Sequence, residues 1–225
     1  SLFAYILDLA PDNADVAVIK GLGEILNGHF SDHVKRLEIR IVEKLLQHQL
    51  TDVQAIAGHI ILNHGVSAEF LPVKVFISLM EAESDVARDI GIKLFKSLPS
   101  PPLLKQPDML ASFCVSEYQD VQRQARSRLR SLADQDTEFG RRVVKELIPY
   151  LFRKEKETGC KHEEIVSLIE KELYKAALKA DTDVIWRLLY ARSKNAQQFG
   201  AFLLIKQDNI ILKPVHWAML ASHEI

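Results

Sequence analysis

The chain has few of the residues that would staple it covalently. Its 225 residues include only two cysteines, Cys114 and Cys160, which lie far apart. One possible pair makes no disulfide framework, so a reducing compartment is expected. The opening SLFAYILDLA is apolar but short, contains Asp8 and lacks a basic leader, so we predict neither a secretory signal nor a membrane span there. No later apolar run is long enough to cross a bilayer, and we expect an intracellular protein, cytoplasmic or nuclear.

Turn-forming residues and an excess of charge of one sign are also lacking. Nine glycines and eight prolines are few, while Leu, Ala, Glu, Lys and Arg dominate, which favours helix over strand. The 29 basic and 30 acidic residues nearly cancel, so no global field selects nucleic acid or an anionic membrane as a partner. A charged binding site should therefore be a local patch.

An Asp-Val pair recurs along the chain. It begins at Asp15, Asp52, Asp85 and Asp120, at intervals of 37, 33 and 35 residues, and returns at Asp183. An aspartate can accept hydrogen bonds from the free N–H groups of a helix start, and its charge complements the helix dipole. Each pair is therefore expected to open a helix.

Apolar residues follow three of these pairs in steps of four. Such steps place the residues on one helix face, which we predict to be buried. The three sets are Val53, Ala57 and Ile61; Val86, Ile90 and Leu94; and Val121, Ala125 and Leu129.

Prolines lie upstream of the pairs. Pro72 and Pro107 each precede the next Asp-Val valine by 14 residues, and Pro149 has a similar apolar context. A proline removes a helical hydrogen bond, so these helices should begin at the proline or bend there. The predicted unit is a pair of helices, of which the first often carries a proline and the second opens with Asp-Val.

This two-helix unit resembles the HEAT family of helical-hairpin repeats, whose second helix has the pattern D-V-x-x-x-A-x-x-x-L. The nearest match is DVQRQARSRL at 120–129, and the resemblance covers roughly residues 1–180. The first copy departs from it at Lys20 and Glu24, and in the fifth unit the loop RKEKETGCKHEE replaces the Asp-Val start. The resemblance implies an all-α superhelix, an α-solenoid of about six helical hairpins.

The expected organisation is a single α-solenoid domain over 1–225, with HEAT-like repeats over 1–180 and a C-terminal helical cap over 181–225. The tail DNIILKPVHWAML, with Pro214 and Trp217, breaks the pattern and should form an irregular cap. Because the chain starts without Met inside a helical pattern, we expect a fragment of a longer protein. Helices are predicted at 2–9, 14–27, 31–48, 51–63, 67–80, 84–98, 103–115, 118–133, 137–154, 162–179, 183–193 and 196–206.

The stretch DVAVIKGLGEILNG at 15–28 has two interpretations, a strand entering a phosphate-binding glycine turn or one repeat helix. GLG lacks the third glycine of a dinucleotide fingerprint, and no alternating strand pattern occurs in the chain. Aligned on Asp15, Gly21 matches Gly58 and Gly91, where small residues allow close helix approach. Gly28 matches Gly65, where a left-handed helix cap is expected. We therefore predict a repeat helix and no cofactor.

The sequence predicts neither a metal site nor a set of catalytic residues. His29 and His33 should lie solvated on a turn, although their spacing would suit two metal ligands on a helix. The segment CKHEE at 160–164 offers ligand-type atoms, but no second cluster at a standard spacing supports structural zinc. No nucleophile–base arrangement or glycine-flanked serine elbow occurs, so the chain is predicted not to be an enzyme.

The most suggestive charged element is QRQARSRLR at 122–130, which holds four arginines and no acid. Helical spacing puts Arg123, Arg126 and Arg130 on one side, away from the apolar face. The equivalent face of the earlier copies is small and apolar, apart from Arg88. One interpretation is that this face of the second helices forms a groove for an acidic amphipathic peptide. The other is that the face is buried in the first copies and merely exposed to solvent in the fourth.

We predict a non-catalytic scaffold or adaptor that binds a protein or peptide on the surface of its second helices. The alternative is a nucleic-acid backbone bound through the same arginine-rich face, with Lys145 extending it, a role that some HEAT-like proteins fill, including alkyl-base glycosylases. A glycosylase would need a pocket such as Asp183, Trp186 and Tyr190, but core packing is favoured for the two aromatic residues. The candidate partner-binding residues are Arg88, Arg123, Arg126, Arg130, Arg141 and Arg142.

Overall fold

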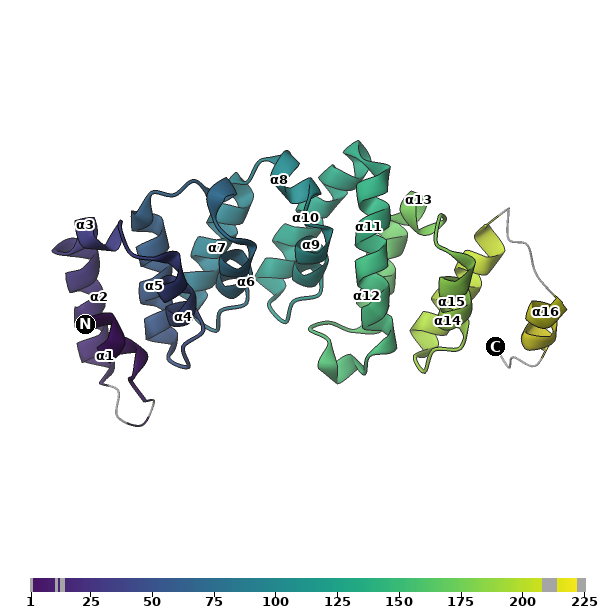
Figure 1. The fold of residues 1–225 in the computed structure, drawn as a ribbon. Coiled ribbons are helices and arrows are strands. Elements are labelled where there is room, and N and C mark those ends of the chain that lie inside the picture. Colours follow the sequence, from purple (N-terminus) through teal and green to yellow (C-terminus); the bar gives the residue numbers. More distant parts are fainter. Residues whose placement is uncertain (1, 11, 13–14, 208–213, 222–225) are drawn as a thin grey trace. The chain divides into compact units, whose positions relative to one another are not determined.

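The computed structural model describes residues 2–10, 12, 15–207 and 214–221 (Figure 1). Every regular element in these residues is a helix, and none of them forms a strand, which confirms the predicted all-α class. The chain divides into two compact units, Ser1–Arg128 and Leu129–Ile225. Across the described residues, no helix is both long and apolar enough to cross a membrane.

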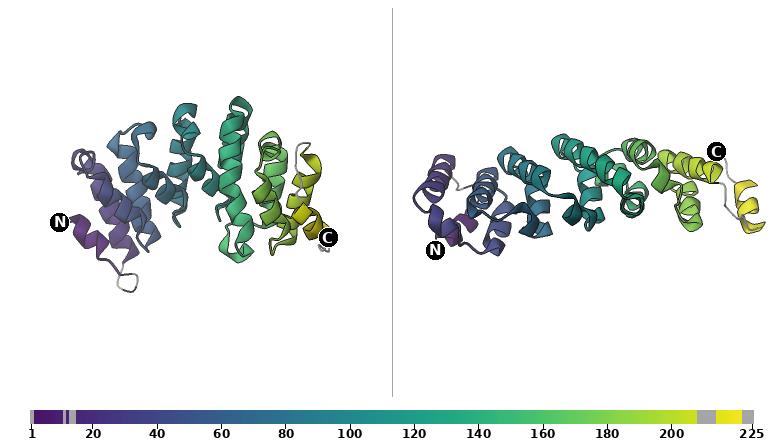
Figure 2. Two further views of the ribbon diagram at one scale, coloured as in Figure 1. Left: turned by 45° about the vertical axis from the view of Figure 1, so that its right-hand side comes forward. Right: turned by 90° about the horizontal axis from the view of Figure 1, so that it is seen from above.

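The first unit is built from neighbouring helices that pack in pairs. Helix α4 packs against α5 and α6 packs against α7, and α5 also contacts α2 and α7 (Figures 1 and 2). The elements are α1 (Leu2–Leu7), α2 (Val16–Gly28), α3 (Ser31–Val34), α4 (Ile39–Leu46), α5 (Thr51–His64), η2 (Ala68–Phe70), α6 (Val73–Met80), α7 (Asp85–Ser97), α8 (Ser100–Leu104), α9 (Pro107–Cys114) and the first part of α10 (Gln119–Gln135).

The second unit starts within α10. Helix α14 packs against α15, α11 contacts α13, and α12 contacts both α13 and α15. The remaining elements are α11 (Thr137–Leu147), η3 (Ile148–Phe152), η4 (Glu155–Glu157), α12 (His162–Glu172), α13 (Tyr174–Ala177), α14 (Thr182–Leu189), α15 (Lys194–Lys206) and α16 (Pro214–Ala221).

The predicted helices occur close to their expected bounds, but several are divided. The span 31–48 breaks into α3 and α4, the span 103–115 into α8 and α9, and the span 162–179 into α12 and α13. Two of the three prolines start an α-helix, because Pro72 is the N-cap of α6 and Pro107 is the first residue of α9. Pro149 lies in the first turn of the 3-10 helix η3, which directly follows α11.

Two of the three predicted buried faces are confirmed. Val53, Ala57 and Ile61 are buried in α5, and the corresponding residues of α10 are fully buried. In α7 the prediction holds for Ile90, which is buried, and is wrong for the other two residues, because Val86 is 43% exposed and Leu94 is only partly buried. This helix packs against α5 through Ala87 and against α6 through Gly91. Its buried arc is therefore rotated by one residue, about 100°.

The helix starts agree with the predicted positions, but the capping groups differ. Asp15 is the N-cap of α2 and accepts a hydrogen bond from the Ala17 N–H at 2.9 Å. Asp52, Asp85 and Asp120 instead lie inside the first turns of their helices, and Ser84 caps α7. Their charges still complement the helix dipoles, but the prediction that each side chain caps its helix is wrong.

The stretch 15–28 is one helix, α2, as predicted. Its glycines differ from their expected roles. A side chain on Gly21 would meet open space, whereas Gly23 lies against Ile56. Gly65 ends α5 with a φ of 67°, in the left-handed conformation, but Gly28 lies inside α2 and the right-handed His29 follows it. The predictions for Gly21 and Gly28 are therefore wrong.

The C-terminal cap is described only in part. Residues 208–213, the first part of the predicted tail, lie outside the described residues, as do residues 222–225 and the side chain of Trp217. Helix α16 begins at Pro214, and the ring of His216 stacks on Trp186 with 4.5 Å between ring centroids.

A candidate basic binding pocket

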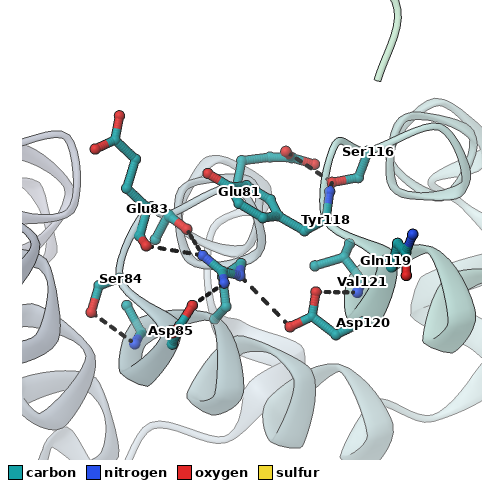
Figure 3. Close-up of polar contacts among 12 residues, drawn as sticks. Glu81, Glu83, Ser84, Asp85, Ser116, Tyr118, Gln119, Asp120 and Val121 are labelled. Atoms are coloured by element: carbon teal, nitrogen blue, oxygen red, sulfur yellow. Dashed lines mark hydrogen bonds and ion pairs between the residues drawn. The ribbon is translucent and has the colours of Figure 1, made fainter. Parts of the chain in front are cut away.

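Arg88, the first candidate residue, is buried inside the first unit. Its guanidinium donates to the carbonyl oxygens of Ala82, at 2.6 Å, and Glu83, at 3.1 Å, and it lies 3.9 Å from the centre of the Tyr118 ring. It also pairs with Asp85 and, at 3.7 Å, with Asp120. Figure 3 labels these two carboxylates together with Tyr118 and Glu83. These contacts join α7 to the start of α10, so Arg88 is positioned to stabilise the fold rather than to meet a partner.

The arginines of α10 differ in how far they are engaged. Arg126 donates from Nε and Nη2 to the Cys114 carbonyl, at 3.1 and 3.0 Å, and so satisfies the last residue of α9. Arg130 forms a two-pronged ion pair with Glu172 at the end of α12, and this hydrogen bonding lowers the pKa of Glu172. Arg123 is exposed, with only a 3.4 Å contact to the carbonyl of Gln119. Two arginines of the predicted stripe, Arg126 and Arg130, therefore bind other residues of the protein itself.

Arg141 and Arg142 lie elsewhere, on the exposed side of α11 in the second unit. Arg141 contacts two carboxylates, Glu138 and Asp181, each at 3.8 Å. The guanidinium of Arg142 lies 5.7 Å from the centre of the Phe139 ring. Both arginines line a cavity that the other four candidates do not reach.

This cavity, the basic pocket, has a volume of about 420 Å³. It lies among α11, η3, the segment after α13 and α14. Its lining includes the buried Val144, Ile148 and Ala176, and its exposed residues are largely cationic. The lining comprises Glu138, Arg141, Arg142, Val144, Lys145, Ile148, Pro149, Phe152, Ala176, Lys179, Ala180, Asp181, Val184 and Arg187.

The charges of the basic pocket are not balanced. Five cationic side chains face two carboxylates, and both carboxylates contact the same residue, Arg141. Within the described part of the chain, no carboxylate lies at ion-pair distance from Lys145, Lys179 or Arg187. Arg187 instead lies over the Phe152 ring, 4.8 Å from its centre. The pocket thus offers three cations without an acidic neighbour beside an apolar surface.

The position of these residues follows from local helix patterns. In α11, one face of the helix is buried and carries Phe139, Val143 and Leu147. Helical geometry then places Arg141 and Lys145, four residues apart, on the opposite side. In α14 the buried Ile185, Leu188 and Leu189 leave Arg187 exposed in the same way. Sequence reasoning found the cations of α11 but missed Lys179 and Arg187, because only the fold brings them to α11.

The other candidate sets do not form a site. Trp186 is buried, as predicted, but Tyr190 is 46% exposed, so its predicted core role is wrong. His29 and His33 are exposed, as predicted. Cys160 and His162 are buried. In the residues that the structure describes, no three His, Cys, Asp or Glu side chains gather in a way that would hold a metal ion.

Comparison with known proteins identifies no relative. No family model and no curated protein matches the chain. Among solved structures, it is similar to a crystal structure of an engineered protein, with a TM-score of 0.35 and 15% sequence identity. That match covers 92% of this chain and 57% of the engineered one. A similarity of this size establishes neither a fold family nor a function.

Proposed function

We propose that the chain is a non-catalytic binding scaffold, an α-solenoid of about six HEAT-like hairpins that holds an acidic protein or peptide segment. The packed pairs α4 with α5 and α6 with α7 support the hairpin architecture. Repeats of this kind bury their core between neighbours and leave a long surface for recognition. The partner would be intracellular, in the cytoplasm or the nucleus, as the sparse cysteines favour.

The observation that carries the binding proposal is the basic pocket. In the part of the chain that the structure describes, Lys145, Lys179 and Arg187 form no ion pair, so acidic groups of a ligand can pair with them without displacing an internal one. The exposed Pro149 and the partly exposed Phe152 and Val184 of the same lining offer apolar surface to a hydrophobic side chain of the same ligand. An acidic amphipathic peptide supplies both groups.

Binding to a nucleic-acid backbone is the second function that the same cations suggest. Phosphates would pair with Lys145, Lys179 and Arg187, and the affinity would fall steeply with salt. However, a phosphate backbone makes no use of the apolar residues between the cations. The pocket therefore favours a peptide over a duplex.

A peptide array tests this proposal. Peptides of about twelve residues that combine Asp and Glu with Leu, Phe or Trp would be screened, and the best binder measured by fluorescence anisotropy. If each of three ion pairs contributes about 0.5–1 kcal/mol, Lys145→Glu, Lys179→Glu and Arg187→Glu together should weaken binding at least tenfold.

The matched control makes the same charge change away from the basic pocket, with Lys20→Glu, Lys93→Glu and Lys96→Glu, all at exposed positions of the first unit. It should bind as the unaltered chain does. Equal losses in both variants would mean that only net charge matters, and tighter binding of a DNA or RNA duplex would favour the second function.

A further inference from the structure

The three cations of the basic pocket that form no ion pair with a described residue come from separate parts of the second unit. Lys145 belongs to the last turn of α11, Lys179 follows α13, and Arg187 lies in α14. All three line the same cavity. An ordinary acidic side chain brings one negative charge and two oxygens to such a set, which leaves most of the positive charge unpaired.

A phosphoryl group matches this surplus better than a carboxylate does. It carries about −1.5 to −2 charges at neutral pH and three strong acceptor oxygens. Building on the proposed function, we propose that the basic pocket recognises a phosphorylated side chain of the peptide partner. The bound peptide would place its phosphoryl group against Lys145, Lys179 and Arg187. An adjacent apolar side chain would pack against the exposed Pro149 and the partly exposed Val184.

Two further contacts support one phosphoryl group at this position. Arg187 lies over the Phe152 ring, so less side-chain freedom is lost when its guanidinium binds an anion. Glu138 and Asp181 contact Arg141, so their negative charges lie at that side of the pocket and disfavour a second anion there. The pocket is thus suited to a single phosphorylated residue rather than to a run of them.

The test compares peptide pools that differ at one central residue. Degenerate pools with phosphoserine, phosphotyrosine, serine or glutamate at the centre, and with apolar residues beside it, would be titrated against the whole chain by fluorescence anisotropy. One of the phosphorylated pools should bind at least about tenfold more tightly than the glutamate pool. The combined variant Lys145→Ala, Lys179→Ala and Arg187→Ala should bind the phosphorylated and glutamate pools equally weakly.

Each other result contradicts a specific statement. Equal binding of the glutamate and phosphorylated pools, with loss of both in the variant, would refute phosphoryl recognition but leave the proposed acidic-peptide site standing. No binding of any pool would refute both. Tighter binding of vesicles that contain a phosphoinositide than of the phosphorylated pools would assign the phosphoryl group to a lipid and overturn the peptide proposal. The variant removes only exposed side chains, and circular dichroism would confirm that it stays folded.

Discussion

Truncation of Arg88 to alanine should lower the free energy of unfolding of the first unit, and the contacts of Arg88 give the size of the loss. The substitution leaves the Ala82 and Glu83 carbonyls without their donor and removes the contact with Tyr118. A buried group left unsatisfied costs about 1–3 kcal/mol, and the cation–π contact adds about 0.5–2 kcal/mol. The pairing with Asp85 adds little, because that carboxylate is 87% exposed. The expected loss is about 3 kcal/mol.

Hydrogen exchange is the suitable assay, because part of a protein can open locally without global unfolding. Amides of α7 should exchange about a hundredfold faster in Arg88→Ala, since about 1.4 kcal/mol corresponds to a factor of ten. Arg123→Ala is the matched control, because that side chain is exposed, and it should change exchange less than about twofold. Equal exchange rates in both variants would refute the assignment of Arg88 to the core of the first unit.

Three other predictions follow from packing and charge. Measured by urea unfolding, Ile61→Ala should lower the free energy of unfolding by about 2–5 kcal/mol, Leu94→Ala by clearly less, and Val86→Ala by about 0.5 kcal/mol or less. Similar losses at all three positions would contradict the assignment of which helix faces are buried. Gly91→Ala should destabilise by about 1–3 kcal/mol, because the new Cβ would lie 2.9 Å from the Leu79 Cβ, whereas Gly21→Ala, with open space around it, should stabilise by about 0.5–1 kcal/mol. Burial raises the pKa of Glu81, although Ser116 donates to it at 3.0 Å. The contribution of Glu81 to stability is therefore present below pH 4.5 and lost as the pH rises through its folded pKa, so Glu81→Gln should gain stability relative to the unaltered chain between pH 4 and 7, and a constant difference would contradict this.

Helix positions were predictable because local patterns determine them. Steps of four apolar residues located α5 and α10, and prolines marked the starts of α6 and α9. The predictions fail where contacts between helices, and not the local sequence, determine which residues are buried. The buried arc of α7 is set by its packing against both α5 and α6, and spacing along one helix does not reveal two neighbours.

The candidate site was predictable only on one helix. Arg141, Arg142 and Lys145 stand out in the sequence, whereas Lys179 and Arg187 join them only through the fold. Arg88 resembled a surface cation by its position in the repeat. Its burial depends on the Asp120 and Tyr118 side chains, which lie at the start of α10 and directly before it.

Photo-crosslinking tests most directly whether the basic pocket binds an acidic peptide. The crosslinking residue p-benzoylphenylalanine would replace Glu138, which is exposed at the pocket, or Phe70, which is 75% exposed in the first unit, and a labelled peptide from the array would be added. A crosslink from position 138 should form and should disappear when Lys145, Lys179 and Arg187 are changed to Glu, and position 70 should give none above background. A crosslink from position 70 alone, or one from position 138 that survives the charge reversal, would show that the basic pocket is not the binding site.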